Sequence, residues 1–133
     1  MITRGTGLEG LEYVFTQAEE QFNVNAIFLL SLCAHESYWG KSKRACEQNN
    51  LTGYDVTGDE AQGKTFDSKE QSILTTAKML GKEYLSVGGL FYVGKLDIYS
   101  VNSIYCPVGG NTWSDDIVSI ADETVKKINK KQV

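Results

Sequence analysis

Apolar residues recur at steps of three and four along much of this chain, the spacing that places them on one face of an α-helix. Near the N-terminus this pattern predicts a helix over residues 7–22, whose opposite face is acidic and turned to solvent. The apolar stripe of that helix consists of Leu8, Leu11, Phe15, Ala18 and Phe22. Such a stripe is buried against a partner element, so we expect a helical core.

The next segment, AIFLLSLCAHESYW, follows Asn25, whose side chain is well suited to cap the start of a helix. It is apolar on nearly every side as far as Ala34, which is typical of a helix enclosed by other elements. The pattern therefore predicts a central, buried helix. This helix carries Glu36 near its C-terminal end.

The pattern changes over residues 40–66, where glycines separate short polar stretches. Short polar stretches separated by glycines predict loops or a small β-hairpin and not a long helix. We therefore expect a lobe at about residues 50–66. Ser68 with Gln71 three positions later is a capping-box signature, so a third long helix is predicted over residues 68–86.

Two more helical segments are predicted in the last third of the chain. A short one holds Ile98, Val101 and Tyr105, and a longer one spans residues 113–128 after a break at Pro107. The lysines that follow complement the negative end of a helix dipole, so we interpret them as a solvated C-terminus.

At 133 residues the chain is most simply one domain, covering residues 1–133, and it is long enough to bury a sizeable core. Its net charge of −4 offers no basic field for nucleic acid or anionic lipid. Its longest apolar run is about half of a membrane span. We therefore expect neither nucleic acid nor a membrane as a partner.

The cysteine and histidine content gives no sign of a metal site. The chain has three cysteines without C-x-x-C spacing and a single histidine, so neither a metal nor another cofactor is expected. Cys33 lies within the apolar helix, where a buried thiol packs as a small hydrophobic group and is inert. We expect three free thiols, with Cys46 and Cys106 as the one pairing to test.

Glu36 is the first candidate for chemistry. A carboxylate that follows an apolar helix and is flanked by Tyr38 and Trp39 can be partly desolvated, which raises its pKa and lets it hold a proton near neutral pH. A general acid in glycoside cleavage needs that property. The alternative is a structural glutamate paired with Lys41 or Lys43, and helical spacing alone favours this alternative.

His35 invites a different interpretation, as the base for a nucleophilic cysteine such as Cys33 or Cys46. Adjacent positions on a helix point about 100° apart, so His35 and Glu36 cannot both face one site squarely. We therefore interpret His35 as a structural or supporting residue.

Four segments that occur in a fixed order favour Glu36 as a catalytic acid over Glu36 as a structural residue. They read AHESYWGKS, NNLTGY, TFDSKEQSI and IYCPVGGNTWSDDIVSI. In this order the chain resembles the bacterial and phage glucosaminidases of glycoside hydrolase family 73, from about Gly7 to Ile128. The resemblance implies a mainly α fold of the α+β lysozyme-like class, in which a central buried helix is surrounded by helices and a small loop or β-hairpin lobe.

The resemblance also implies roles for individual residues. Glu36 matches the catalytic general acid of the family, and Tyr105 matches a tyrosine that many members place opposite that glutamate. Asn50, Leu51 and Gly53 match a turn that shapes the floor of the cleft. Tyr38 and Tyr54 are further candidates for substrate binding, among several tyrosines that could offer flat faces to a polysaccharide.

The partner of Glu36 in catalysis is left open at this point. Some relatives carry a second carboxylate on the lobe, and the candidates here are Asp59 and Glu60, followed by Asp55 and Asp67. Others manage without one and would use the 2-acetamido group of the substrate. The chain also departs from the family pattern at Tyr38, Lys41 and Thr52, which puts the shape of the sugar subsite in question.

The resulting hypothesis is an endo-β-N-acetylglucosaminidase that hydrolyses the β-1,4 bond between N-acetylglucosamine and N-acetylmuramic acid in peptidoglycan. The alternatives are a muramidase or lytic transglycosylase on the same fold, and a non-catalytic module that binds the cell wall. The start of the chain lacks the pattern of a secretory signal. We therefore expect a phage lysin or virion tail domain, part of a larger protein, acting at the host cell wall, with a secreted bacterial autolysin domain as the alternative.

Overall fold

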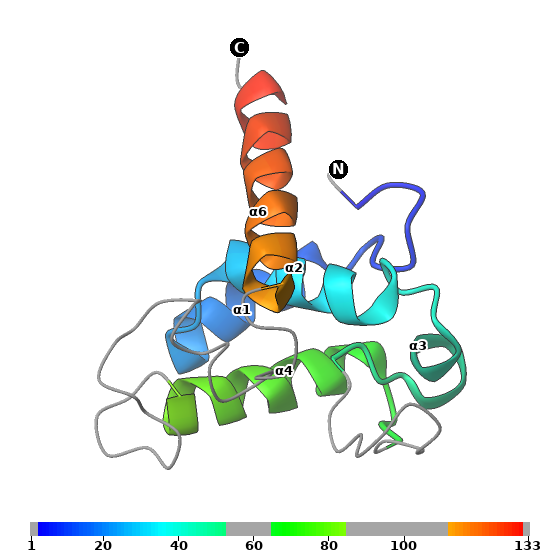
Figure 1. Cartoon of the computed structure of the whole chain (residues 1–133). Coiled ribbons are helices and arrows are strands. Elements are labelled where there is room, and N and C mark those ends of the chain that lie inside the picture. Colours follow the sequence, from blue (N-terminus) through cyan, green and yellow to red (C-terminus); the bar gives the residue numbers. More distant parts are fainter. Residues whose placement is uncertain (1–2, 53–64, 85–111, 132–133) are drawn as a thin grey trace.

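All regular structure in the described residues is helical. The computed structural model describes residues 3–52, 65–84 and 112–131 (Figure 1). The elements are α1 (Glu12–Phe22), α2 (Ala26–Ser37), α3 (Lys43–Gln48), α4 (Lys69–Met79), the π-helical turn η1 (Leu80–Tyr84) and α6 (Thr112–Lys131). The predicted mainly α class is confirmed. The predicted lobe falls largely on residues 53–64, and the short helix around Val101 falls within 85–111, both outside the described residues.

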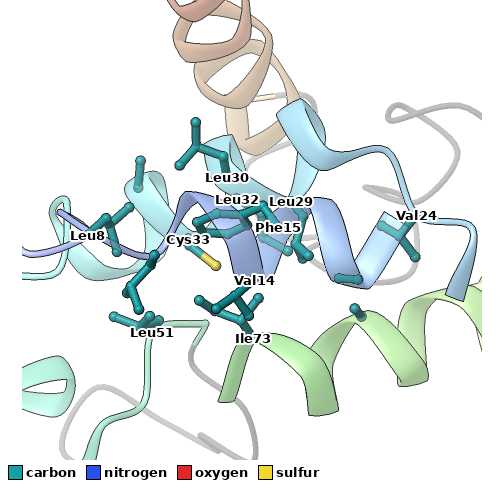
Figure 2. Packing of buried hydrophobic residues seen from close by; sticks show 14 of the residues in the cluster. Leu8, Val14, Phe15, Val24, Leu29, Leu30, Leu32, Cys33, Leu51 and Ile73 are labelled. Atoms are coloured by element: carbon teal, nitrogen blue, oxygen red, sulfur yellow. The ribbon is translucent and has the colours of Figure 1, made fainter. Parts of the chain in front are cut away.

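The helix α2 is the central element, as its apolar sequence predicts. It packs against α1, α4 and α6, and in Figure 1 α4 runs beneath α1 and α2 while α6 stands across them. Figure 2 shows Leu29, Leu32 and Cys33 of α2 among side chains from the neighbouring elements. Burying a leucine of this kind contributes roughly 1.5–3 kcal/mol, so this core fixes the position of α2.

The start of α2 is set by local capping. Asn25 Oδ1 accepts a hydrogen bond from the Phe28 N–H at 2.9 Å, which satisfies one of the free donors at the N-terminus of the helix. This confirms the cap predicted from the sequence. The helix ends at Ser37, where the chain enters a left-handed conformation.

The first helix begins later than predicted. Phe15 and Ala18 of its predicted stripe are buried, and Phe22 is partly buried. However, α1 starts at Glu12, so Leu8 and Leu11 are buried from the turns that precede it. Gly5 and Gly10 in that segment have φ values of 78° and 84°, which a right-handed helix does not accommodate. The prediction of a helix from residue 7 was therefore wrong, because apolar spacing does not show which backbone buries it.

The short helix α3 lies in the region where loops were predicted. The Ser42 hydroxyl accepts from the Ala45 N–H at 3.2 Å and starts the helix, and Asn49, with φ 54°, ends it. Only Ala45 is buried along its six residues. One inward residue leaves no helical periodicity, which is why the sequence pattern did not indicate it.

The predicted capping signature at the start of α4 is confirmed. Ser68 Oγ accepts from the Gln71 N–H at 3.1 Å, and Gln71 Oε1 accepts in return from the Asp67 N–H at 3.0 Å. The reciprocal bond thus goes to the residue before the cap. The helix then widens into the π-helical turn η1 at Leu80.

The last helix, α6, is a few residues longer than predicted and packs on α2 through its N-terminal half, with Ser114 and Ile117 fully buried. Its last turns extend away from the other described helices (Figure 1). Among the described helices, none has both the length and the apolar character required to cross a membrane.

Candidate active site

Glu36 lies in the last turn of α2, one residue before the helix ends. Its side chain is partly buried, and it follows Cys33 by one helical turn on the same face of α2. Burial raises the pKa of the Cys33 thiol, and the negative charge of Glu36 raises it further. The Glu36 carboxylate is therefore close enough to the buried face of α2 to affect Cys33. The Glu36 carboxyl group is therefore partly removed from solvent and lies close to the core, at the C-terminal end of the central helix.

The three residues after α2 form a strained turn. The φ values are 50° at Tyr38, 57° at Trp39 and 80° at Gly40. Only glycine adopts this left-handed region freely, and each of the other two costs roughly 1 kcal/mol or more. The Trp39 N–H donates to the Ala34 carbonyl at 2.9 Å, and the Gly40 N–H donates to Ser37 Oγ at 2.8 Å. The turn thereby closes the end of the helix that carries the candidate acid.

The segment before α1 packs directly on this turn. The Gly7 N–H donates to the Trp39 carbonyl at 2.7 Å, and Lys69 Nζ, at the start of α4, donates to the Gly7 carbonyl at 3.3 Å. The sequence pattern did not mark Gly7, Ser37 or Gly40 as residues of the site. The contact joins positions far apart in the chain, so the spacing of hydrophobic residues gives no sign of it.

The predicted Asn50 and Leu51 of the cleft floor are brought to the same region but are buried. Asn50, Leu51 and Thr52 are 1%, 0% and 1% exposed. The Leu51 N–H donates to Ser72 Oγ at 3.4 Å, and the hydroxyls of Thr52 and Thr76 share a hydrogen bond of 2.6 Å. The segment Asn50–Thr52, called the floor segment below after its predicted role, is therefore anchored on α4, and its buried side chains are out of reach of a ligand.

Leu51 also connects this segment to the helix of the candidate acid. Figure 2 shows the Leu51 side chain among those of Leu8, Cys33 and Ile73, which belong to the same buried cluster. Thr52 is one of the positions at which the sequence departs from the pattern of the family that it resembles. Because its hydroxyl is bonded to α4 inside the core, this departure is accommodated by packing.

Two hydrogen bonds bring the chain together on both sides of residues 53–64. The Phe66 N–H donates to the Gln48 carbonyl at 2.8 Å, and Asn49 Nδ2 donates to the Phe66 carbonyl at 3.1 Å. The ends of the predicted lobe are thus joined at the C-terminal end of α3. The lobe itself, with the candidates Asp59 and Glu60, lies outside the described residues.

Other predicted site residues stand as follows. Tyr38 is 79% exposed, so its ring is accessible to a ligand. Asp67 is exposed just before the cap of α4. The remaining candidates, Gly53, Tyr54, Asp55 and Tyr105, lie outside the described residues and stay predictions.

His35 lies beside an acidic residue of the last helix, α6. Its Nδ1 lies 3.9 Å from Asp116 Oδ2 on α6, with the two side chains 28% and 53% exposed. An ion pair of this exposure contributes little to stability, at most about 1 kcal/mol when the imidazole is protonated. The geometry supports the interpretation of His35 as a residue that joins helices.

The two described cysteines are both free thiols, but their environments differ. Cys33 is fully buried, whereas Cys46 is exposed on α3. Because the raised pKa of Cys33 disfavours the thiolate, and because the core excludes reagents, Cys33 should be inert in the folded protein. Cys106 lies outside the described residues.

In a Cys106→Ser background at about pH 8, we expect a thiol reagent such as iodoacetamide to modify Cys46 rapidly and Cys33 only after unfolding. Peptide mass spectrometry with and without denaturant reads out both sites.

The raised pKa of Cys33 also makes the stability of the fold depend on pH. The folded state holds the Cys33 proton more tightly than the unfolded state, so stability falls as the pH rises above the unfolded thiol pKa. A Cys33→Ala variant should lack that alkaline loss.

Across residues 3–52, 65–84 and 112–131, no three His, Cys, Asp or Glu side chains come together in a way that could hold a metal ion. The described part of the site instead offers one partly buried carboxylate, Glu36, and one exposed aromatic ring, Tyr38, beside the buried segment Asn50–Thr52. Such a set suits proton transfer to an uncharged ligand with hydroxyl groups.

Comparison with known proteins gives consistent matches. The family model described as "Glucosaminidase: Mannosyl-glycoprotein endo-beta-N-acetylglucosaminidase" matches residues 13–124. Two proteins of Streptococcus pneumoniae, from strains TIGR4 and R6, are each 35% identical over 127 residues, which cover 93% of this chain. Both are named "Putative endo-beta-N-acetylglucosaminidase". The chain spans 18% and 17% of their lengths, respectively, less than one fifth of either relative.

A solved structure shares the fold. The chain superposes with a TM-score of 0.60 on a chain from a structure titled a type VI secretion system effector-immunity complex from Pseudomonas protegens. The match covers 90% of this chain and 92% of that one, at 20% sequence identity. At this identity the likeness concerns the fold alone.

Proposed function

Because the chain belongs to the glucosaminidase family of glycoside hydrolases, we propose that it is an endo-β-N-acetylglucosaminidase acting on peptidoglycan, with Glu36 as the general acid. The bond cleaved would be the β-1,4 linkage between N-acetylglucosamine and N-acetylmuramic acid. The observation that carries this assignment is the placement of Glu36. It is partly buried at the end of the central helix, beside a strained turn and an anchored floor.

In the proposed reaction the Glu36 carboxylic acid gives its proton to the glycosidic oxygen as the bond to C1 of N-acetylglucosamine breaks. The leaving sugar then departs as a neutral alcohol. Positive charge develops at C1 and the ring oxygen, and it has to be met from the opposite face. Glu36 alone cannot do both, since a single carboxyl group stands on one side of the bond.

Two routes meet that charge. In the first, the carbonyl oxygen of the substrate's own 2-acetamido group attacks C1, and water later opens the cyclic intermediate, so that configuration is retained. In the second, a lobe carboxylate such as Asp59 or Glu60 activates water for direct attack, and configuration is inverted. Tyr105 would contact the substrate or the intermediate. We favour the first route, because Glu36 is the one carboxylate that several independent features support.

Product analysis tests the position of the cut. Purified chain is incubated with peptidoglycan, the new reducing ends are reduced with borohydride, and the fragments are sequenced by mass spectrometry. We expect reduced N-acetylglucosamine. Reduced N-acetylmuramic acid would show a muramidase, and 1,6-anhydro-N-acetylmuramic acid a lytic transglycosylase. Binding to purified walls without any fall in turbidity would show a non-catalytic wall-binding module.

For the biological setting we propose a catalytic domain that works at the bacterial cell wall within a larger protein. The relatives support the second part, since this chain matches less than one fifth of each. A phage-borne lysin or virion tail domain remains our proposal. The alternative is a secreted bacterial autolysin domain, a setting in keeping with the bacterial origin of the two relatives. The genes that flank the reading frame would decide, since virion or holin genes beside it support the phage setting.

A further inference from the structure

The contact between Gly7 and Gly40 stands out in the described residues because it joins the backbone of the N-terminal segment to the backbone of the turn after Glu36. A Cβ atom built on Gly7 would lie 2.4 Å from the Gly40 carbonyl oxygen and 2.8 Å from Gly40 Cα. A Cβ built on Gly40 would lie 2.6 Å from the Gly7 carbonyl carbon. These are backbone atoms, so neither collision could be relieved by a side-chain rotation.

We infer that this glycine pair is a positioning device, in which residues 3–11 hold the left-handed turn Tyr38–Gly40 and thereby fix the orientation of Glu36. The inference rests on the proposed function, since it concerns how the proposed acid is held. Its first support is the strain at Tyr38 and Trp39, which persists only where the surroundings impose it. The Gly7 N–H supplies such a constraint through its 2.7 Å bond to the Trp39 carbonyl.

The second support is the way the turn holds the last carbonyl groups of α2. Helix ends leave their final carbonyls without partners inside the helix. Here the Ala34 carbonyl accepts from the Trp39 N–H, and the Ser37 carbonyl accepts from the N–H groups of Lys41 and Ser42, each at 2.9 Å. If the turn moved, these bonds would break and the last turn of α2 would fray. The residue carried by that last turn is Glu36.

The N-terminal segment is itself held at two further points. The Thr3 hydroxyl donates to Glu12 Oε1 at the start of α1, and Thr3 is fully buried. Lys69 Nζ from α4 bonds the Gly7 carbonyl at 3.3 Å. The segment is therefore hydrogen-bonded to α1 and α4, and it contacts the turn through Gly7. Displacing a general acid by about 1 Å can cost up to about 100-fold in rate.

The test compares Gly7→Ala with Gly10→Ala. Gly7 does not need a positive φ, so alanine there introduces only the collision with Gly40. Gly10, in the same segment, has a φ of 84° and nothing within 4 Å of a built Cβ, so alanine there introduces only backbone strain. Gly10→Ala is thus a matched control that destabilises the segment without pushing on the turn.

With soluble glycan strands as substrate, we expect Gly7→Ala to lower kcat by roughly 10- to 100-fold with KM within about twofold, and Gly10→Ala to leave both close to wild type. A second readout does not depend on activity. In ¹H–¹⁵N spectra, the amide signals of Glu36 and Ser37 should shift in Gly7→Ala and stay in place in Gly10→Ala. A folded Gly7→Ala with unchanged kcat and unchanged signals at these residues would overturn the inference.

If Gly7→Ala does not fold, Ser37→Ala tests the same device from the other side. Ser37 Oγ accepts from the Gly40 N–H at 2.8 Å and donates to the Cys33 carbonyl, so its removal releases the turn without adding an atom. We expect the same fall in kcat at unchanged KM, and wild-type kcat in Ser37→Ala would refute the positioning role. A wild-type chain without activity on peptidoglycan would instead refute the proposed function, while the amide shifts would still report on the glycine pair.

Discussion

Glu36→Gln is expected to reduce peptidoglycan cleavage by about 10²- to 10⁴-fold, the range that a general acid contributes. Glutamine keeps the size of the side chain and its oxygen acceptor, but it has no proton of suitable acidity to give to the leaving oxygen. The partly buried position at the end of α2 should tolerate the change, so the free energy of unfolding should stay within about 1 kcal/mol of wild type. Turbidity loss and reducing-end release measure the rate, and urea unfolding measures the stability.

The matched control is Glu47→Gln, which removes an exposed carboxylate from the nearby helix α3. Its activity should equal that of wild type, because an exposed charge outside the floor segment has no part in the proposed chemistry. Full activity in Glu36→Gln would contradict the assignment of Glu36 as the general acid. A variant that still binds walls while it has lost cleavage would separate catalysis from recognition.

The parts of the fold that local physics determines were predicted well. Asn25 and Ser68 cap their helices as expected, because a cap is made within four residues of chain. The apolar run of α2 identified the central helix, because a helix apolar on all sides has to be enclosed. These features need no knowledge of distant residues.

The parts that depend on distant contacts were not predictable from spacing. Leu8 and Leu11 are buried from turns, and their spacing alone suggested a helix. The contact of Gly7 with Gly40 brings two small residues together across the chain, and a glycine carries no side chain whose pattern could be traced. Hydrophobic periodicity reports burial, but it does not report which backbone carries out the burial or what it touches.

For the candidate site, the order of four segments supported Glu36, and helical geometry separated it from His35. The structure agrees with that separation, since His35 faces Asp116 on α6. Which group stands opposite Glu36 was left open by the sequence, because residue types alone do not fix distances across a cleft. Asp59, Glu60 and Tyr105 keep that role as predictions.

The Leu51→Ala variant is expected to lose about 2–5 kcal/mol of stability, the usual cost of removing a large aliphatic side chain from a core. Leu51 is fully buried in the same cluster as Leu8, Cys33 and Ile73 (Figure 2). It also packs the floor segment against residues of α2 and α4. Urea unfolding measures the loss as a lower transition midpoint.

Leu51→Met is the control, since a swap that nearly conserves volume costs less than about 1.5 kcal/mol. The two variants also separate packing from recognition. A side chain with no exposed surface cannot touch a sugar, so Leu51→Met should keep the wild-type KM for soluble glycan strands. A large rise in KM without loss of stability in either variant would contradict the buried placement. If the expected result is found, Leu51 supports the segment Asn50–Thr52 by packing inside the core and not by contact with the substrate.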